Sequence, residues 1–188
     1  MIASLSAHTE EIARLGARIA AAGKGTGPAY AAALNRVGAM TRTGMVRAMV
    51  GQTGLKRKVI DKALRKTTAS PGSLTYMVRS AGGDISLKYF GARETRRGVS
   101  AAPFGHRQLF AGTFIKGGRF PARKTAKGLN GHVYRRTGKG RGPLRLVKSG
   151  VIIPREMVID DTRAIFFRTV QANLPGRLLH ELGRRLAS

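Results

Sequence analysis

Residues 28–51, PAYAAALNRVGAMTRTGMVRAMVG, contain the periodic pattern on which the fold depends. Small and apolar side chains recur there three or four residues apart, which is typical of a helix that packs closely against another element. They are Tyr30, Leu34, Val37, Thr41, Gly44 and Ala48. Pro28 suits the first turn of such a helix. We expect the turn Gly51-Gln52-Thr53-Gly54 to end it, with Thr53 as the N-cap of a short helix over residues 55–64.

Helical patterns also occur toward both ends of the chain. An amphipathic helix is predicted over residues 4–22 and ends at the glycine-rich stretch 23–27. Near the C-terminus, the pattern from Ile165 to Leu174 predicts a helix that breaks at Pro175, and a last short helix follows over residues 178–186. The apolar stripes of residues 30–48 and 178–186 exceed what one small core requires. We therefore expect part of them to lie between subunits.

The middle of the chain has the alternating pattern of strands. After Ser70-Pro71-Gly72 the period changes to two, and residues 73–92 predict a β-hairpin around the turn Gly82-Gly83-Asp84. Shorter strand candidates lie at 98–102, 112–116 and 131–136, separated by stretches rich in glycine and basic residues. We expect the loop of residues 116–130 to be the least ordered in isolation.

These patterns predict an α+β fold. N-terminal helices and a C-terminal helix would pack on an antiparallel β-sheet with long, basic, glycine-rich loops. We expect one structural domain with three regions: a helical region over 1–70, a β-rich basic region over 71–155 and a helical region over 156–188.

The charge is extreme and unevenly distributed. The chain has 35 Lys and Arg against 9 Asp and Glu, a net charge of +26. No acid occurs between Glu94 and Glu156, whereas fifteen basic residues fall there. This acid-free segment cannot neutralise itself, so phosphate groups or an acidic protein surface are its expected partners.

The residues that enzyme chemistry needs are not grouped in this sequence. Cysteine is absent, which excludes disulfides, thiolate metal sites and cysteine nucleophiles. The four histidines have no metal-ligand spacing, and Asp160-Asp161 fits the first turn of a helix better than a metal site. No apolar run approaches the length of a membrane span, and Glu10 and Glu11 interrupt any secretory signal. We expect no enzyme activity, no cofactor, no metal and no membrane segment.

The candidate site is a set of basic residues in the glycine-rich part of the acid-free segment. We expect them to contact nucleic-acid phosphate or an acidic partner without base specificity. They are Arg119, Arg123, Lys124, Lys127, Arg135, Arg136, Lys139, Arg141 and Arg145. Because side chains alternate along a strand, all nine need not act together.

Three pairs of segments resemble the prophage minor tail protein Z family of tailed bacteriophages. They are residues 33–37 (ALNRV) with 52–56 (QTGLK), 87–93 (LKYFGAR) with 98–101 (GVSA), and 112–115 (GTFI) with 131–139 (GHVYRRTGK). Their order and spacing match the family's pattern over roughly residues 30–158.

The resemblance implies a non-enzymatic virion protein, assembled in the bacterial host cytoplasm. It would act as a tail-completion or tail-terminator-like component of the neck, the head-tail connector. The implied partners are further copies in a homo-hexameric ring, head-completion or adaptor proteins and the tail tube, and phage DNA bound non-specifically. A ribosomal-type basic RNA-binding protein is the alternative, supported by the high isoelectric point and the Gly-Lys-Gly-Arg-Gly run at 138–142.

Overall fold

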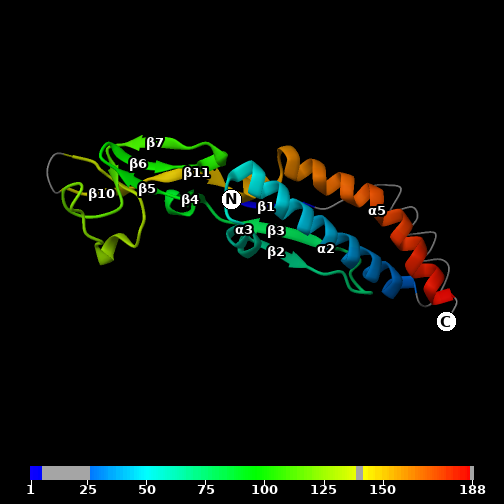
Figure 1. The fold of residues 1–188 in the computed structure, drawn as a ribbon. Helices are drawn as coiled ribbons and strands as arrows, with labels where there is room; N and C mark the ends of the chain where they lie inside the picture. Colours follow the sequence, from blue (N-terminus) through cyan, green and yellow to red (C-terminus); the bar gives the residue numbers. More distant parts are fainter. Residues whose placement is uncertain (6–25, 139–141, 187–188) are drawn as a thin grey trace.

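Two long helices, α2 (Thr26–Thr53) and α5 (Asp160–Leu186), lie side by side along one half of the molecule (Figure 1). The computed structural model describes residues 1–5, 26–138 and 142–186. A group of short strands forms the other half, so that the molecule is elongated, with helices at one end and loops at the other (Figure 1). The helix expected over residues 6–22 falls outside the described residues, and residues 4–5 belong to a strand instead.

Small residues let α2 and α5 approach closely. Gly44 of α2 faces Ile165 of α5, where an added Cβ would lie 2.9 Å from Cγ2 of the isoleucine. Along the contact, α2 buries Val37 and Met45, and α5 buries Phe166 and Leu174. The stripe of residues 30–48 is therefore largely used within the chain. The expectation that it exceeds the needs of the core is wrong for most of its residues.

The predicted end of the first long helix is confirmed, because α2 ends at Thr53 within the turn of residues 51–54, whereas the predicted break in α5 does not occur. In α2, the Thr53 hydroxyl donates to the Met49 carbonyl (2.6 Å) and accepts from the Leu55 N–H (3.2 Å). Thr53 therefore closes the end of α2 instead of capping α3 (Arg57–Ala63), whose N-cap is Lys56. In α5, Pro175 is exposed and the helix runs through it, because Leu174 and Leu178 on either side are both buried.

The first sheet lies against the helical half and contains strands from distant parts of the chain. Its order is β1 (Ile2–Leu5), β3 (Met77–Ala81) and β2 (Leu64–Thr67), all antiparallel. Arg42 of α2 ties the helix to this sheet and to α3. Its guanidinium donates to Asp61 Oδ1 (3.2 Å), to the Asp61 carbonyl (2.9 Å) and to the Leu64 carbonyl (3.0 Å).

The hairpin expected over residues 73–92 does not form. Its two strands exist as β3 and β4 (Asp84–Ser86), but they belong to different sheets, and β4 pairs with β11 (Lys148–Ile152). The Asp84 carboxylate accepts from the N–H groups of Ser149 (3.1 Å) and Gly150 (2.9 Å), which holds β11 beside β4. Gly82, which directly follows β3, donates its N–H to the Met1 carbonyl (3.2 Å), so the predicted turn residue instead links the end of β3 to the start of β1.

Two further small antiparallel sheets complete the β-rich half. One has the order β5 (Arg93–Thr95), β6 (Gly98–Ala101) and β7 (Gln108–Ala111). The other has the order β10 (Leu144–Leu146), β9 (Tyr134–Arg136) and β8 (Thr113–Phe114). Strands thus form within all three shorter candidate segments. The α+β class is confirmed, although the strands form several small sheets instead of one.

One continuous apolar cluster connects the two halves. It contains Met45 and Met49 from α2 together with Val99, Val133 and Val151 from the β-rich half. The short helices α4 (Ile153–Met157) and η2 (Pro103–Gly105) lie at the junction. The remaining single turns are η1 (Leu87–Tyr89) and η3 (Lys127–Leu129). No helix in the described part of the chain is both long and apolar enough to cross a membrane.

Two glycines inside α2 give a matched test of this packing. An added Cβ at Gly38 would lie 2.3 Å from Cδ1 of the Tyr76 ring, whereas one at Gly51 would meet nothing within 4 Å. We predict that Gly38→Ala destabilises the protein by roughly 1–3 kcal/mol through overpacking. Gly51→Ala should stabilise it by roughly 0.5–1 kcal/mol, because alanine is the better helix former. Urea unfolding of both variants measures the difference, and equal effects would contradict the packing of Tyr76 on α2.

Candidate nucleic-acid interface

The glycine-rich part of the acid-free segment lies at the end of the molecule that is farther from the two long helices (Figure 1). We call this region the loop end and define it as β8, β9 and β10 with the loop of residues 116–130. The loop folds back on itself, because Gly117 and Lys124 exchange two backbone hydrogen bonds of 2.9 Å. Backbone pairing therefore sets the course of the chain at this end, and most of its charged side chains are exposed.

Three of the nine candidate residues are exposed on this loop. Arg119, Lys124 and Lys127 have exposed side chains, and none of them forms an ion pair with an acid in the described part of the chain. Lys127 begins the single turn η3. These three side chains are available to an external anion.

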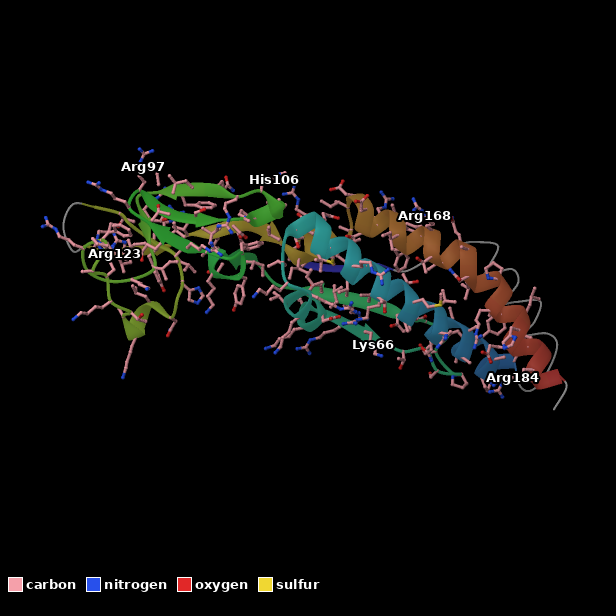
Figure 2. The ribbon with its side chains drawn as sticks, in the orientation of Figure 1. Lys66, Arg97, His106, Arg123, Arg168 and Arg184 are labelled. Atoms are coloured by element: carbon pink, nitrogen blue, oxygen red, sulfur yellow. The ribbon has the colours of Figure 1, made fainter. Side chains whose placement is uncertain are left out.

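Arg123 differs from its neighbours because it has an acidic partner inside the chain. Its guanidinium binds the Glu94 carboxylate, which also accepts the Ile115 N–H at 3.2 Å. Glu94 lies just before the acid-free segment in the sequence, and the fold brings it across to the loop. The sequence shows that no acid lies within the segment itself, but it does not show that Glu94, outside the segment, reaches Arg123. The Arg123 side chain lies within the loop end in Figure 2.

Strand pairing divides the remaining described candidates between the two faces of a small sheet. Arg135 and Arg145 are directly opposite each other on β9 and β10, so their charges share one face. Arg135 also donates to the Ala111 carbonyl (3.2 Å). Arg136 points to the other face, where its guanidinium lies 5.3 Å from the centre of the Phe114 ring. Lys139 and Arg141 lie outside the described residues.

The few acids of the chain are largely occupied by internal contacts. Asp61 binds Arg42 and Arg57, and Glu94 binds Arg123. Glu181 is 3% exposed and pairs with Arg177 (2.7 Å) and Arg184 (3.2 Å). Asp84 holds the backbone of residues 149–150, and buried Glu156 accepts from Gln52 Nε2 (2.8 Å).

Asp160 and Asp161 occupy the first turn of α5, as the sequence predicts. Carboxylates there compensate the helix dipole. Among the described residues, no carboxylate forms an ion pair with Arg119, Lys124, Lys127, Arg135, Arg136 or Arg145 of the loop end.

One side-chain cluster has the outward form of a catalytic dyad. Ser86 Oγ lies 2.8 Å from Nδ1 of His132, and Lys88 Nζ lies 3.3 Å from Nε2 of the same ring. An ammonium group can only donate hydrogen bonds, so Nε2 is the acceptor and Nδ1 carries the proton toward Ser86. The ring therefore cannot take a proton from the serine. This arrangement lacks the base that activates a nucleophile.

Metal-binding clusters and cavities are the other features at which chemistry could occur. No group of three or more His, Asp or Glu side chains that could hold a metal ion occurs among the described residues. A cavity of about 70 Å³ lies between α2, α5 and residues 74–78, lined by apolar side chains such as Leu34, Phe166 and Val170. Its lining includes Thr41, Thr75 and Tyr76 but no charged group.

A second basic surface was not among the nine candidates. It consists of exposed residues on α3, β2 and the preceding and neighbouring segments, and we call it the α3–β2 surface. Its members are Lys56, Lys58, Lys62, Arg65, Lys66 and Arg79. The basic face of residues 56–66 is visible in the sequence, but Arg79 joins it only through the pairing of β3 with β2.

The His132 cluster predicts a pH-dependent stability. Burial, and then the charge of Lys88, lower the pKa of His132 below its usual value. The folded protein therefore binds fewer protons at this ring than the unfolded chain does. The stability contribution is present above about pH 6.5 and is lost as the pH falls through the lowered pKa. In His132→Asn, the decrease in the free energy of unfolding between neutral and mildly acidic pH should become smaller.

The matched control is His180→Asn, because His180 is exposed on α5. Urea unfolding at several pH values should give the wild-type pH profile for this control. The same profile for His132→Asn would show that Lys88 and burial do not hold His132 neutral.

Comparison with protein-family models, with curated proteins and with solved structures finds no match to this chain.

Proposed function

We propose that this chain is a structural virion protein of a tailed bacteriophage, a tail-completion component of the head-tail connector. In this role it has no enzyme activity, and copies of it form a homo-hexameric ring around the DNA passage. The ring contacts head-completion or adaptor proteins on one side and the tail tube on the other. The observation that carries the proposal is the loop end, where no carboxylate that the structure describes pairs with the exposed bases, while acids such as Glu94 and Glu181 bind bases within the fold.

The residues that carry the family resemblance support the proposal by their positions. Phe90, Val99 and Val133 come from the resembling segments, and all three are buried in the apolar cluster. Asn35, from the first segment, exchanges hydrogen bonds of 2.9 and 2.8 Å with the backbone of Ala69. The resembling residues thus build the fold, which is where a structural family would be expected to keep its pattern.

The exposed apolar surface favours a protein that works in an assembly. Exposed apolar side chains lie on both halves, for example Leu179 on α5 (66% exposed) and Leu109 on β7 (47% exposed). Such surface is available for contacts between subunits.

Single-stranded RNA is a less suitable ligand for the loop end than a duplex backbone. Recognition of unpaired bases uses exposed aromatic rings on which the bases stack. In the described part of the loop end, Phe120 is exposed, but Phe114 is half-buried under Arg136 and Tyr134 is half-buried as well. One exposed ring favours contact with phosphate over the stacking of successive bases.

Neutralising the loop end should weaken DNA binding and particle completion. The variant combines Arg119→Gln, Lys124→Gln, Lys127→Gln and Arg145→Gln, all at exposed positions. Each lost phosphate contact should reduce the slope of log K against log salt by about 0.9. The free energy of unfolding should change little, because these are surface substitutions. Fluorescence anisotropy with short duplex DNA and the yield of complete phage particles measure the two effects.

The matched control removes four exposed charges elsewhere, by Arg36→Gln, Arg47→Gln, Arg155→Gln and Arg168→Gln. DNA binding by this control should keep most of the salt dependence of the wild-type protein. If the control and the loop-end variant bind DNA equally well, the loop end is not the DNA contact. If DNA binding falls but complete particles form normally, the virion role is contradicted while the binding surface stands.

Assembly should depend on the exposed apolar face of α5. Leu178 is buried, whereas Leu179 is 66% exposed. Leu179→Lys should therefore leave the monomer folded and shift the oligomer toward smaller species in sedimentation velocity experiments. Leu109→Lys on β7 is a second variant, which tests whether the exposed apolar residue of the β-rich half takes part in the same contacts. A wild-type protein that stays monomeric at all accessible concentrations in the presence of DNA would contradict the ring.

A further inference from the structure

We propose that the α3–β2 surface is a second binding site for the phosphate backbone of duplex nucleic acid, separate from the loop end. This inference rests on the described side chains alone and does not depend on the proposed virion role.

The surface holds six exposed cations, and no carboxylate of the described residues forms an ion pair with any of them. Lys58 and Lys62 are four residues apart on α3, so they lie about 5–6 Å apart on one helix face. The nearby acid is Asp61, but its carboxylate already binds Arg42 (3.2 Å) and Arg57 (3.3 Å). No other ion pair in the described part of the chain involves a residue of this surface. The charge is therefore left for an external anion.

Strand pairing adds a contact that works against the stability of the free protein. Arg65 of β2 and Arg79 of β3 are directly opposite each other, and both are exposed. Like charges in this position repel, since their Cβ atoms are only about 4.5–5.5 Å apart. Arg79 Nε donates a hydrogen bond to the Met77 sulfur, which carries no charge and so does not offset the repulsion. An anion bound between the two guanidinium groups would relieve the repulsion.

Protection of a sheet edge does not explain this arrangement. Lysines on an edge strand can prevent pairing with another molecule, and β2 is an edge strand in the order β1-β3-β2. Arg79, however, belongs to the central strand β3, where no edge needs protection. Its charge on the same face as Arg65 needs another reason, and a polyanionic ligand supplies one.

The composition of the surface favours a nucleic-acid backbone over an acidic protein. Protein interfaces are depleted in lysine and have an apolar or aromatic centre. Here four of the six residues are lysines, and no large hydrophobic side chain of residues 56–67 or 77–81 is among those exposed. The absence of exposed aromatic rings there also removes base stacking, so duplex phosphate is the better ligand.

The two basic surfaces are far enough apart to act separately. In Figure 2, Lys66 lies below α2 in the helical half, whereas Arg123 marks the loop end on the opposite side of the view, and Arg168 lies along the upper side of α5. A single chain can therefore contact backbone phosphates at two places. Several chains in an assembly would line a longer path for the duplex.

The test uses a variant with four basic residues replaced by glutamine, the same number as in the loop-end variant and its control. It combines Lys58→Gln, Lys62→Gln, Arg65→Gln and Lys66→Gln in the full chain. Binding to short duplex DNA is measured by fluorescence anisotropy over a range of salt concentrations. We expect the slope of log K against log salt to become shallower by about 0.9 for each contact removed. Adding the loop-end substitutions should make the slope shallower still, because the two sites bind phosphate separately.

Two outcomes would overturn the inference. In the first, the α3–β2 variant binds DNA as tightly as the control carrying Arg36→Gln, Arg47→Gln, Arg155→Gln and Arg168→Gln. In the second, the variant loses affinity for polyglutamate but not for DNA, which would assign the surface to an acidic protein. Neither outcome affects the loop end, whose own variant tests the proposed function.

A single substitution separates binding from a structural role. Arg79→Gln removes the repulsion with Arg65, so it should raise the midpoint of thermal unfolding at low salt and weaken DNA binding. High salt should abolish the stability difference, because salt screens the exposed charges. A decrease in thermal stability at low salt, together with unchanged DNA binding, would show that Arg79 serves the fold instead.

Discussion

A shortage of carboxylates is the constraint on which both the fold and its surface depend. With 35 basic and 9 acidic residues, most bases cannot have an acidic neighbour. The acids that the structure describes are placed where they hold elements together: Asp61 joins α3 to α2, Glu94 joins β5 to the 116–130 loop, and Asp84 joins β4 to β11. Because these acids are engaged in the joints, most exposed charged side chains in the described part of the chain are basic.

The packing of α2 against α5 gives this surface its shape. Glycine at position 44 lets the helices approach, and Arg42 anchors α2 to the first sheet and to α3. The β-rich half continues from the same apolar cluster and carries the loop end away from the helices (Figure 1). The two basic surfaces, marked by Lys66 and Arg123 in Figure 2, therefore lie on different halves of the molecule.

Periodicity in the sequence predicts the type of each element better than its partners or its ends. The helix from Pro28 and the alternation around residues 77–86 are both present. The hairpin fails because the pairing of β4 with β11 depends on hydrogen bonds to Asp84 from residues about 65 positions later. Pro175 fails to break α5 because burial of the flanking leucines outweighs the lost backbone hydrogen bond.

In the candidate site too, the sequence does not predict which residues become partners. Arg119, Lys124 and Lys127 are exposed, whereas Arg123 binds a carboxylate that only the fold brings near. The position of Arg65 directly opposite Arg79 likewise depends on strand register, which composition does not encode.

The salt dependence of duplex DNA binding by the unmodified chain tests the central claim most directly. If exposed bases bind phosphate by releasing counterions, 6 to 10 contacts should give a slope of log K against log salt between about −5 and −9. Duplexes of unrelated sequence should bind with nearly equal affinity, because phosphates carry no sequence information. A slope near zero, or strong preference for one sequence, would contradict the account.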